Sequence, residues 1–272
     1  MTLLRPINSV MMGFAVFTGE FIAARGFPSF TDILYGFLVG FFLTAATMAI
    51  NDYYDIEIDK INDPQRPLPS GVVGLREALV GGIILGVLGI IFAALTNIQA
   101  LSIALIALIL MIYYNTRGKR TGFLGNIIVS ICVALPFLYG GSVIGRIPFL
   151  LIFFSLMAFF ANMGREVIKG IADIKGDKTR GVKTLAILFG NVIASRIATC
   201  MFILSIIISL FPLLMDLISI LYLPFIAISD LGLIWSSFKI LEDPSPFKAK
   251  NEKKRVLIWM LLGLIGYITG NI

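Results

Sequence analysis

The sequence predicts an all-α protein that crosses a membrane many times. Of its 272 residues, 58% are hydrophobic and only 14% are charged, whereas a soluble domain has about a quarter charged residues. The mean hydropathy is +0.96. Apolar runs long enough to span the hydrocarbon core of a bilayer recur along the whole chain, with short loops between them. We therefore expect one membrane domain over residues 1–272.

Nine of these runs follow one another, and each is interpreted as a transmembrane helix. Turn-forming residues separate several of them, as at Gly26-Phe27-Pro28 and Phe211-Pro212. The first run is too long for the apolar part of a signal peptide, so we expect it to be retained. The predicted helices are residues 6–24, 30–50, 77–95, 98–114, 122–143, 147–164, 194–212, 215–238 and 255–270.

Lysine and arginine are distributed unevenly over the predicted loops. All of the 22 except Arg25 and Arg146 lie at the N-terminus or near the loops after the second, fourth, sixth and eighth helices. The positive-inside rule predicts that these segments are cytoplasmic in the cell membrane and that the C-terminus lies outside. Because orientation explains the net charge of +6, we expect no nucleic-acid partner.

Histidine is absent from the sequence, which excludes the most common general base and the most common zinc ligand. The two cysteines, Cys132 and Cys200, lie inside apolar runs and have no metal-ligand spacing. We interpret them as small buried apolar residues.

The first candidate site is the segment NDYYDIEIDK at residues 51–60, directly after the second predicted helix. Asn51, Asp55 and Asp59 are four residues apart, so a helix places them on one face, whereas Asp52 and Glu57 point elsewhere. Like charges at this spacing repel, and a divalent cation would remove that cost. The alternative is a solvated acidic end of a membrane helix. Three prolines in the following INDPQRPLPSG should stop the helix.

A second acidic segment lies at residues 162–185, after the sixth predicted helix. Five polar positions are spaced by four, three, four and four residues, which predicts one continuous helical stripe leaving the membrane. They are Asn162, Glu166, Lys169, Asp173 and Asp177. The alternative is a solvated helix held by Glu–Lys pairs.

A basic loop, YYNTRGKR at residues 113–120, follows the fourth predicted helix on the same membrane face. Arg117, Lys119 and Arg120 are either orientation anchors or a clamp for phosphate groups. Mg²⁺ binds through one or two carboxylates together with substrate phosphates. Acidic segments, a basic loop and an apolar bundle beneath them would suit a diphosphate with a long hydrocarbon tail.

These segments resemble motifs of the UbiA superfamily of intramembrane prenyltransferases. NDYYDIEID resembles its NDxxDxxxD element and DIKGD its second DxxxD element; residues 66–68, 114–119 and 181–185 also look like family features. The resemblance implies a nine-helix UbiA-type bundle with a lateral, lipid-facing cavity. It also implies Mg²⁺ as the cofactor, bound by Asn51, Asp55, Asp59, Asp173 and Asp177.

The resemblance further implies roles in catalysis and in substrate binding. The catalytic set would be Asp55, Asp173 and Lys119, with Mg²⁺ and basic side chains stabilising the leaving diphosphate while an allylic cation forms. Aromatic rings would shelter the cation. The expected substrate-binding residues are Asn8, Arg66, Tyr114, Arg117, Lys119, Arg120, Asn126, Asn162, Glu166, Lys169, Lys178 and Lys183. Asp230, inside a predicted helix, is either functional or part of a helix–helix hydrogen bond.

The acceptor is the harder question, because the family prenylates aromatic acids, quinone precursors, porphyrins, chlorophyllides and a glycerol phosphate lipid. The chain is short and resembles the archaeal branch most. We therefore expect geranylgeranyl transfer from its diphosphate to the hydroxyl of geranylgeranylglyceryl phosphate, in archaeal ether-lipid synthesis. The cations Lys175, Lys178, Arg180 and Lys183 would suit the acceptor's phosphate.

Two alternatives to this function remain. One is an aromatic acceptor such as 4-hydroxybenzoate or a quinone precursor. The more remote one is a cation transporter, but such proteins usually bind ions near the middle of the membrane on broken helices. The sequence does not indicate the prenyl chain length, the general base, the number of metal ions or the oligomeric state.

Overall fold

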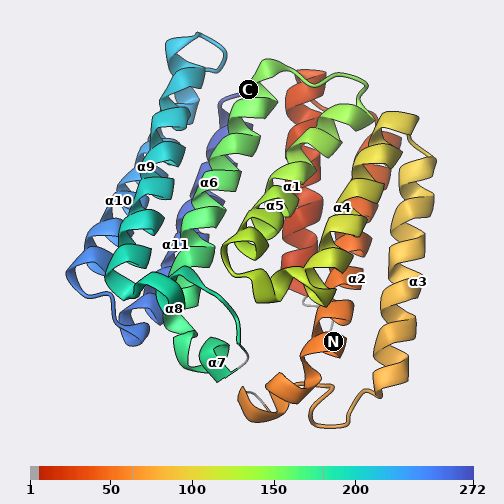
Figure 1. Cartoon of the computed structure of the whole chain (residues 1–272). Coiled ribbons are helices and arrows are strands. Elements are labelled where there is room, and N and C mark those ends of the chain that lie inside the picture. Colours follow the sequence, from red (N-terminus) through yellow and green to blue (C-terminus); the bar gives the residue numbers. More distant parts are fainter. Residues whose placement is uncertain (1–5, 63, 180) are drawn as a thin grey trace. The chain divides into compact units, whose positions relative to one another are not determined.

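The computed structural model describes residues 6–62, 64–179 and 181–272, so Arg180 lies outside the described part (Figure 1). Over these residues the secondary structure consists of helices without strands. The chain divides into two compact units, Met1–Thr116 with Leu135–Ile147, and Arg117–Ala134 with Pro148–Ile272. Helix α5 (Phe123–Val143) begins in the second unit and ends in the first.

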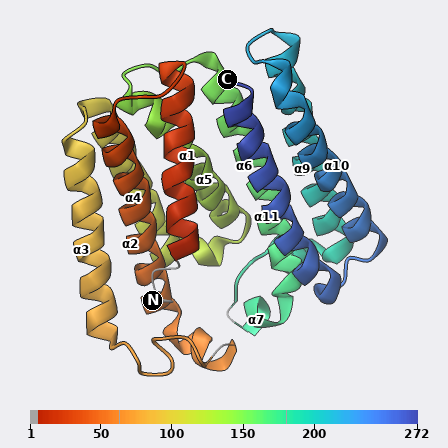
Figure 2. The ribbon, with the colours of Figure 1, turned by 180° about the vertical axis from the view of Figure 1, so that it is seen from behind.

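The first unit contains α1 (Pro6–Ala24), α2 (Phe30–Asn62), α3 (Leu75–Ala94), α4 (Ile98–Thr116) and the end of α5. Helix α2 packs against α1, α3 and α4 (Figure 2). Small residues allow close helix packing, since a Cβ on Gly140 of α5 would lie 2.2 Å from the Val16 carbonyl oxygen of α1. Val16 and Val39 belong to the core of this unit.

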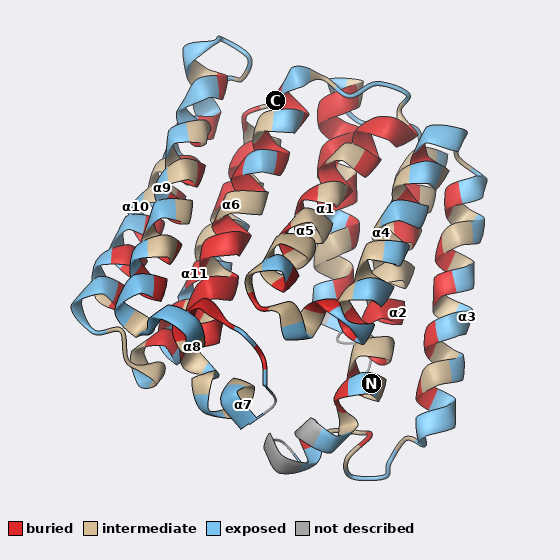
Figure 3. Ribbon diagram, in the orientation of Figure 1, coloured by how far each residue is buried: buried red, intermediate tan, exposed pale blue. Residues whose placement is uncertain are grey.

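The second unit contains two 3₁₀ helices and six α-helices besides the start of α5. In chain order they are η1 (Gly118–Thr121), α6 (Phe149–Ala172), α7 (Ile174–Thr179), α8 (Leu185–Phe189), α9 (Asn191–Leu214), η2 (Ile220–Tyr222), α10 (Leu223–Glu242) and α11 (Pro246–Thr269). Helix α6 packs against both α9 and α11, and Figure 3 shows buried residues along much of its length. Ile168, Phe202 and Val256 are fully buried in this core.

Seven of the described helices are long and apolar enough to cross a membrane. Their outward faces carry large apolar side chains, such as Ile109 at 64% exposed and Phe238 at 67%. A soluble protein would rarely expose so much contiguous apolar surface, whereas lipid tails cover it readily. The prediction of an all-α, polytopic membrane protein is therefore confirmed. The count of nine spans stays a prediction, because Asn8–Ala24 is a shorter apolar helix and α11 begins with a charged stretch.

The eighth predicted helix, at residues 215–238, is wrong at its start. Helix α9 continues through Pro212 to Leu214, and α10 begins only at Leu223. Asp216 has a φ of +53°, which ends the preceding helical turn, and Pro224 occupies the first turn of α10, where proline is favoured.

The ninth predicted helix, at residues 255–270, begins too late. Helix α11 starts at Pro246, after Ser245. The Ser245 hydroxyl accepts a hydrogen bond from the backbone N–H of Lys248, which is the arrangement of a helix N-cap. Ser-Pro is thus the start signal, and the charged first turns that follow do not resemble a membrane helix.

Candidate active site

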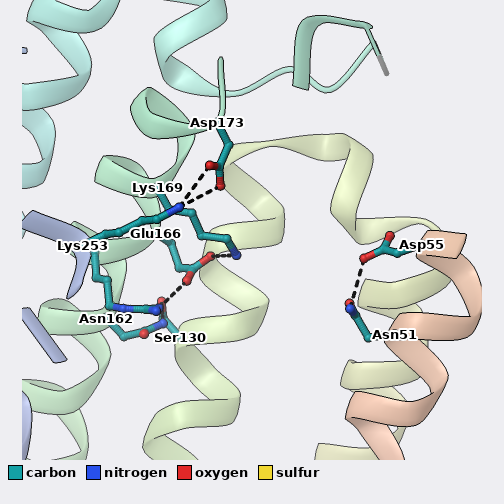
Figure 4. Close-up of polar contacts among 9 residues, drawn as sticks. Asn51, Asp55, Ser130, Asn162, Glu166, Lys169, Asp173 and Lys253 are labelled. Atoms are coloured by element: carbon teal, nitrogen blue, oxygen red, sulfur yellow. Dashed lines mark hydrogen bonds and ion pairs between the residues drawn. The ribbon is translucent and has the colours of Figure 1, made fainter. Parts of the chain in front are cut away.

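The first acidic motif, residues 51–60, occupies the last turns of α2, which continues beyond its apolar part and ends at Asn62. The proline-rich stretch ends the helix there, as predicted. Asp55 and Asp59 are 7% and 5% exposed, so the motif is not a solvated helix end. The Asn51 side-chain amide donates to the Asp55 carboxylate at 3.1 Å (Figure 4). Asn51, Asp55 and Asp59 therefore lie on one face of α2, as predicted.

Asp52 is a third buried carboxylate of this motif, at 4% exposed, and sequence reasoning placed it elsewhere. Its spacing of three and seven residues from Asp55 and Asp59 is itself a helical-face pattern, so a signal was present. Glu57 is exposed and pairs with Lys60 at 2.8 Å, as expected for a residue on the opposite side. The buried face of the motif therefore carries three carboxylates.

Arg66, a predicted substrate-binding residue, donates to the Asp59 carboxylate at 2.6 Å. The loop after α2 thus folds back and neutralises one of the three charges. Asp55 accepts a hydrogen bond from the neutral Asn51 amide. Oxygen ligands of this kind, held on one rigid helix, are what Mg²⁺ prefers.

Neither unit gathers three acidic or thiol side chains closely enough to hold a metal ion alone, among the residues described. One or two carboxylates suffice for Mg²⁺ when phosphate oxygens and water complete the coordination. The first acidic motif therefore fits a Mg²⁺ ion that arrives with a phosphorylated substrate.

Asn115 is a further polar residue at this level of the first unit, and sequence reasoning gave it no role. It lies near the end of α4, which packs against α2, and is 7% exposed. Among the described residues, neither atom of its side-chain amide has a hydrogen-bond partner. A buried amide without partners is costly, so this group is suited to a phosphate, an ion or a water molecule.

The second acidic motif, residues 173–177, does not continue α6 as predicted. Helix α6 ends at Ala172, Asp173 leaves helical geometry with φ −101° and ψ 12°, and α7 begins at Ile174. The prediction of one unbroken helical stripe is therefore wrong at Asp173, although Ala172 and Ile174 on either side of it still pack against the core. The Asp177 N–H still donates to the Asp173 carbonyl at 3.0 Å, which keeps the two residues one turn apart.

The inner part of this predicted stripe is engaged in contacts within the protein. The Asn162 amide donates to the Ser130 hydroxyl at 3.0 Å. Glu166, 5% exposed, pairs with Arg165 at 2.8 Å and Lys169 at 3.0 Å. A buried carboxylate needs such partners, so these contacts have a structural role of their own. Substrate binding by Asn162, Glu166 and Lys169 stays a prediction.

The basic loop contributes η1 to the second unit and lies against the segment that follows the second acidic motif. The Lys183 N–H donates to the Arg120 carbonyl at 3.4 Å. Gly122 sits at this contact with a φ of +65°, and a Cβ there would lie 1.8 Å from the Lys183 carbonyl oxygen. Arg120 and Lys183 have exposed side chains, so two of the predicted phosphate-binding segments are neighbours.

The remaining predicted binding residues have these positions. Asn8 is exposed on α1, Tyr114 is half-buried on α4, and Asn126 is half-buried in the first turn of α5. Arg117 and Lys178 are exposed, the latter on α7, and Lys119 is half-buried in η1. The roles of all six stay predictions.

Asp230 is half-buried on α10 and takes part in a helix–helix hydrogen bond. It accepts from the Ser209 hydroxyl of α9 at 2.6 Å. The contact corresponds to the structural alternative for this residue.

Lys253 of α11 is a site residue that sequence reasoning missed. Its ammonium lies 3.0 and 3.2 Å from the two oxygens of Asp173 (Figure 4). The two residues are 80 positions apart, so the contact depends on the packing of α11 against α6 and no local pattern indicates it.

Comparisons with known proteins identify relatives of this chain. The protein is 37% identical to a digeranylgeranylglyceryl phosphate synthase of Thermococcus sibiricus, over 99% of this chain and 96% of that one. A solved structure of a digeranylgeranylglyceryl phosphate synthase superposes with a TM-score of 0.84 at 33% identity, covering 99% of this chain and 96% of that one.

A UbiA homolog from Archaeoglobus fulgidus, bound to DMAPP and Mg²⁺, has a TM-score of 0.73 at 22% identity, covering 98% of this chain and 97% of that one. At this identity the likeness shows the fold. A sequence model of the UbiA prenyltransferase family matches residues 12–262, which is nearly the whole chain. The protein therefore belongs to the UbiA prenyltransferase family.

Proposed function

We propose that this protein transfers a geranylgeranyl group from geranylgeranyl diphosphate to the free hydroxyl of geranylgeranylglyceryl phosphate. The reaction depends on Mg²⁺ and builds an archaeal ether lipid. The observation that carries the choice of acceptor is the 37% identity to a digeranylgeranylglyceryl phosphate synthase over nearly the full length of both chains. The family carries the reaction type, prenyl transfer.

The buried carboxylates of α2 support the metal dependence. Asp52, Asp55 and Asp59 are each at most 7% exposed at the end of a helix whose preceding part is apolar. Burial of three carboxylates on one helix face is unfavourable without cations. Arg66 pairs with Asp59, and a divalent ion would add positive charge to this face. The Archaeoglobus fulgidus homolog was solved with Mg²⁺, which agrees with this proposal.

In the proposed mechanism, the first motif would hold Mg²⁺, and so would the pair Asp173 and Asp177. The bound metal would stabilise negative charge on the diphosphate as it leaves. Lys119 and Arg117 donate to the remaining diphosphate oxygens, where the charge develops. The apolar helices exclude water, which would otherwise capture the allylic cation.

The acceptor also carries a phosphate, and the chain offers further cations for it. Lys178 and Lys183 follow the second acidic motif and are exposed. We propose that they bind the acceptor headgroup.

We also propose that the motifs and the N-terminus lie on the cytoplasmic side of the cell membrane and that the C-terminus lies outside. The Lys and Arg distribution supports this orientation.

The proposal is tested with the purified protein in detergent or lipid nanodiscs. Geranylgeranyl diphosphate and geranylgeranylglyceryl phosphate are supplied with Mg²⁺, and the product is identified by mass. The expected product has gained one geranylgeranyl group, with one diphosphate released per transfer. Excess chelator should abolish both the lipid product and the release of diphosphate. Full turnover in chelator would contradict the metal dependence, and diphosphate release without the expected lipid would contradict the acceptor.

A further inference from the structure

The ion pair between Lys253 and Asp173 connects the last helix of the chain to the second acidic motif. The Lys253 side chain is 20% exposed and that of Asp173 is 46% exposed. The ammonium contacts both carboxylate oxygens, at 3.0 and 3.2 Å. Both residues belong to the second unit, where α11 packs against α6. The lysine is therefore held at the carboxylate by the core packing.

This contact occupies the carboxylate that the proposed function assigns to Mg²⁺. An ammonium that donates to both oxygens of a carboxylate takes one lone pair of each and brings a positive charge to the place where a metal ion would bind. Mg²⁺ coordination also has strict geometry and dehydrates reluctantly. Metal binding at Asp173 therefore competes with Lys253 for the same carboxylate.

The displaced ammonium would remain near the site, because another buried anion lies beside it. Glu166 is 5% exposed and already pairs with Arg165 and Lys169, and Lys253 is close enough to interact with it electrostatically. Figure 4 shows the side chains of Lys253, Lys169 and Glu166 gathered below Asp173. A lysine that loses its partner here moves only by rotation of its own side chain.

We propose, on the basis of the proposed function, that Lys253 has two successive partners. In the absence of metal it is the counterion of Asp173. When Mg²⁺ takes Asp173, the ammonium turns to a phosphate oxygen of the substrate. Lys253 thus neutralises the Asp173 carboxylate before Mg²⁺ binds and contacts a substrate phosphate after Mg²⁺ has bound. Binding of the metal and binding of the phosphorylated substrate therefore favour each other.

The test uses the full-length protein and three variants. Lys253→Met keeps the length of the side chain and removes its charge, and Lys253→Arg keeps the charge. Lys254→Met is the matched control, because Lys254 is the exposed neighbour on the same helix. Asp173 is half-exposed, so losing its partner should not unfold the protein, and thermal unfolding of each variant checks this.

The first measurement is the affinity of the substrate-free protein for Mn²⁺, measured by electron paramagnetic resonance, with Mg²⁺ as competitor. Loss of a partly exposed ion pair should tighten metal binding by Lys253→Met about two- to fivefold, the range for such pairs. Lys254→Met should leave it unchanged. Equal metal affinity of Lys253→Met and the wild type would overturn the proposal.

The second measurement is phosphate binding in saturating Mg²⁺, with two probes in separate arms. One is the thiolo analogue of geranylgeranyl diphosphate and the other is geranylgeranylglyceryl phosphate. Lys253→Met should bind one of them about tenfold more weakly or worse, as expected for a lost charged hydrogen bond, and Lys253→Arg should recover most of this. The arm that weakens identifies the phosphate. Unchanged binding of both probes would overturn the proposal.

These readouts separate the inference from the proposed function. Metal affinity of the substrate-free protein does not depend on which acceptor is prenylated. If the wild type makes the expected lipid but Lys253→Met shows neither effect, the inference fails alone. If both binding effects appear but no lipid product forms, the proposed acceptor fails alone.

Discussion

Gly122 provides a sharp test of whether the position of the basic loop matters, because its substitution changes no charge. The residue has a φ of +65° and a ψ of −104°, a conformation that side chains rarely adopt. A Cβ would lie 1.8 Å from the Lys183 carbonyl oxygen and 3.0 Å from the Thr184 nitrogen. Both neighbours are backbone atoms, so a rotamer change cannot relieve the clash.

Gly181 is the matched control for Gly122→Ala. It has a φ of +66°, and apart from its chain neighbours a Cβ there would meet no atom of the described residues within 4 Å. The unfavourable backbone conformation should cost about 1–3 kcal/mol in either variant. Only Gly122→Ala also requires the loop and residue 183 to separate by about 1.5 Å, which overpacking studies suggest costs about 1–3 kcal/mol more.

The expected result is a difference between the two variants in both stability and rate. A catalytic group displaced by about 1 Å can lower the rate roughly a hundredfold. We therefore expect kcat/KM of Gly122→Ala to fall by about that factor, whereas Gly181→Ala stays within a few-fold of wild type. The measurements are thermal unfolding in detergent and initial rates of diphosphate release. Equal losses in the two variants would refute the argument that the η1 contact positions the basic loop.

Three further predictions concern charged and buried groups. Asp55→Asn should keep the fold and lower the rate of prenyl transfer at least about a hundredfold, because a group that stabilises developing charge is lost. Near-normal initial rates of this variant would show that Asp55 is not part of the metal site. Lys119→Ala should slow diphosphate release with any acceptor, whereas Lys183→Ala should raise the acceptor KM about tenfold or more; identical kinetic effects would contradict two phosphate sites. Gly36→Ala should lower the unfolding temperature, because its Cβ would collide with the fully buried Glu20 carboxylate. The double variant Gly36→Ala with Glu20→Ala should recover part of that decrease in unfolding temperature. A decrease equal to the sum of the two single variants would contradict the contact.

The parts of the fold that were predicted correctly have local causes. The lengths of the apolar runs predicted the bounds of α3 and α4 to within two residues. The prolines after Asn62 predicted the end of α2. The four-residue spacing of Asn51, Asp55 and Asp59 placed them on one face because α2 continues through them.

The parts that sequence reasoning missed depend on tertiary packing. Nothing local distinguishes Asp173 from the helical positions before it, yet α6 ends at Ala172 and Asp173 leaves helical geometry. Lys253 is one of several lysines in a charged stretch, and only the packing of α11 on α6 brings it to Asp173. The burial of Asn115 likewise follows from the contact of α4 with α2.

Acceptor competition tests the central claim most directly. The purified protein is given geranylgeranyl diphosphate and Mg²⁺ with equal concentrations of geranylgeranylglyceryl phosphate and 4-hydroxybenzoate, and both products are quantified by mass. The proposed function predicts that prenylated lipid accounts for nearly all of the diphosphate released. A preponderance of prenylated benzoate would contradict it.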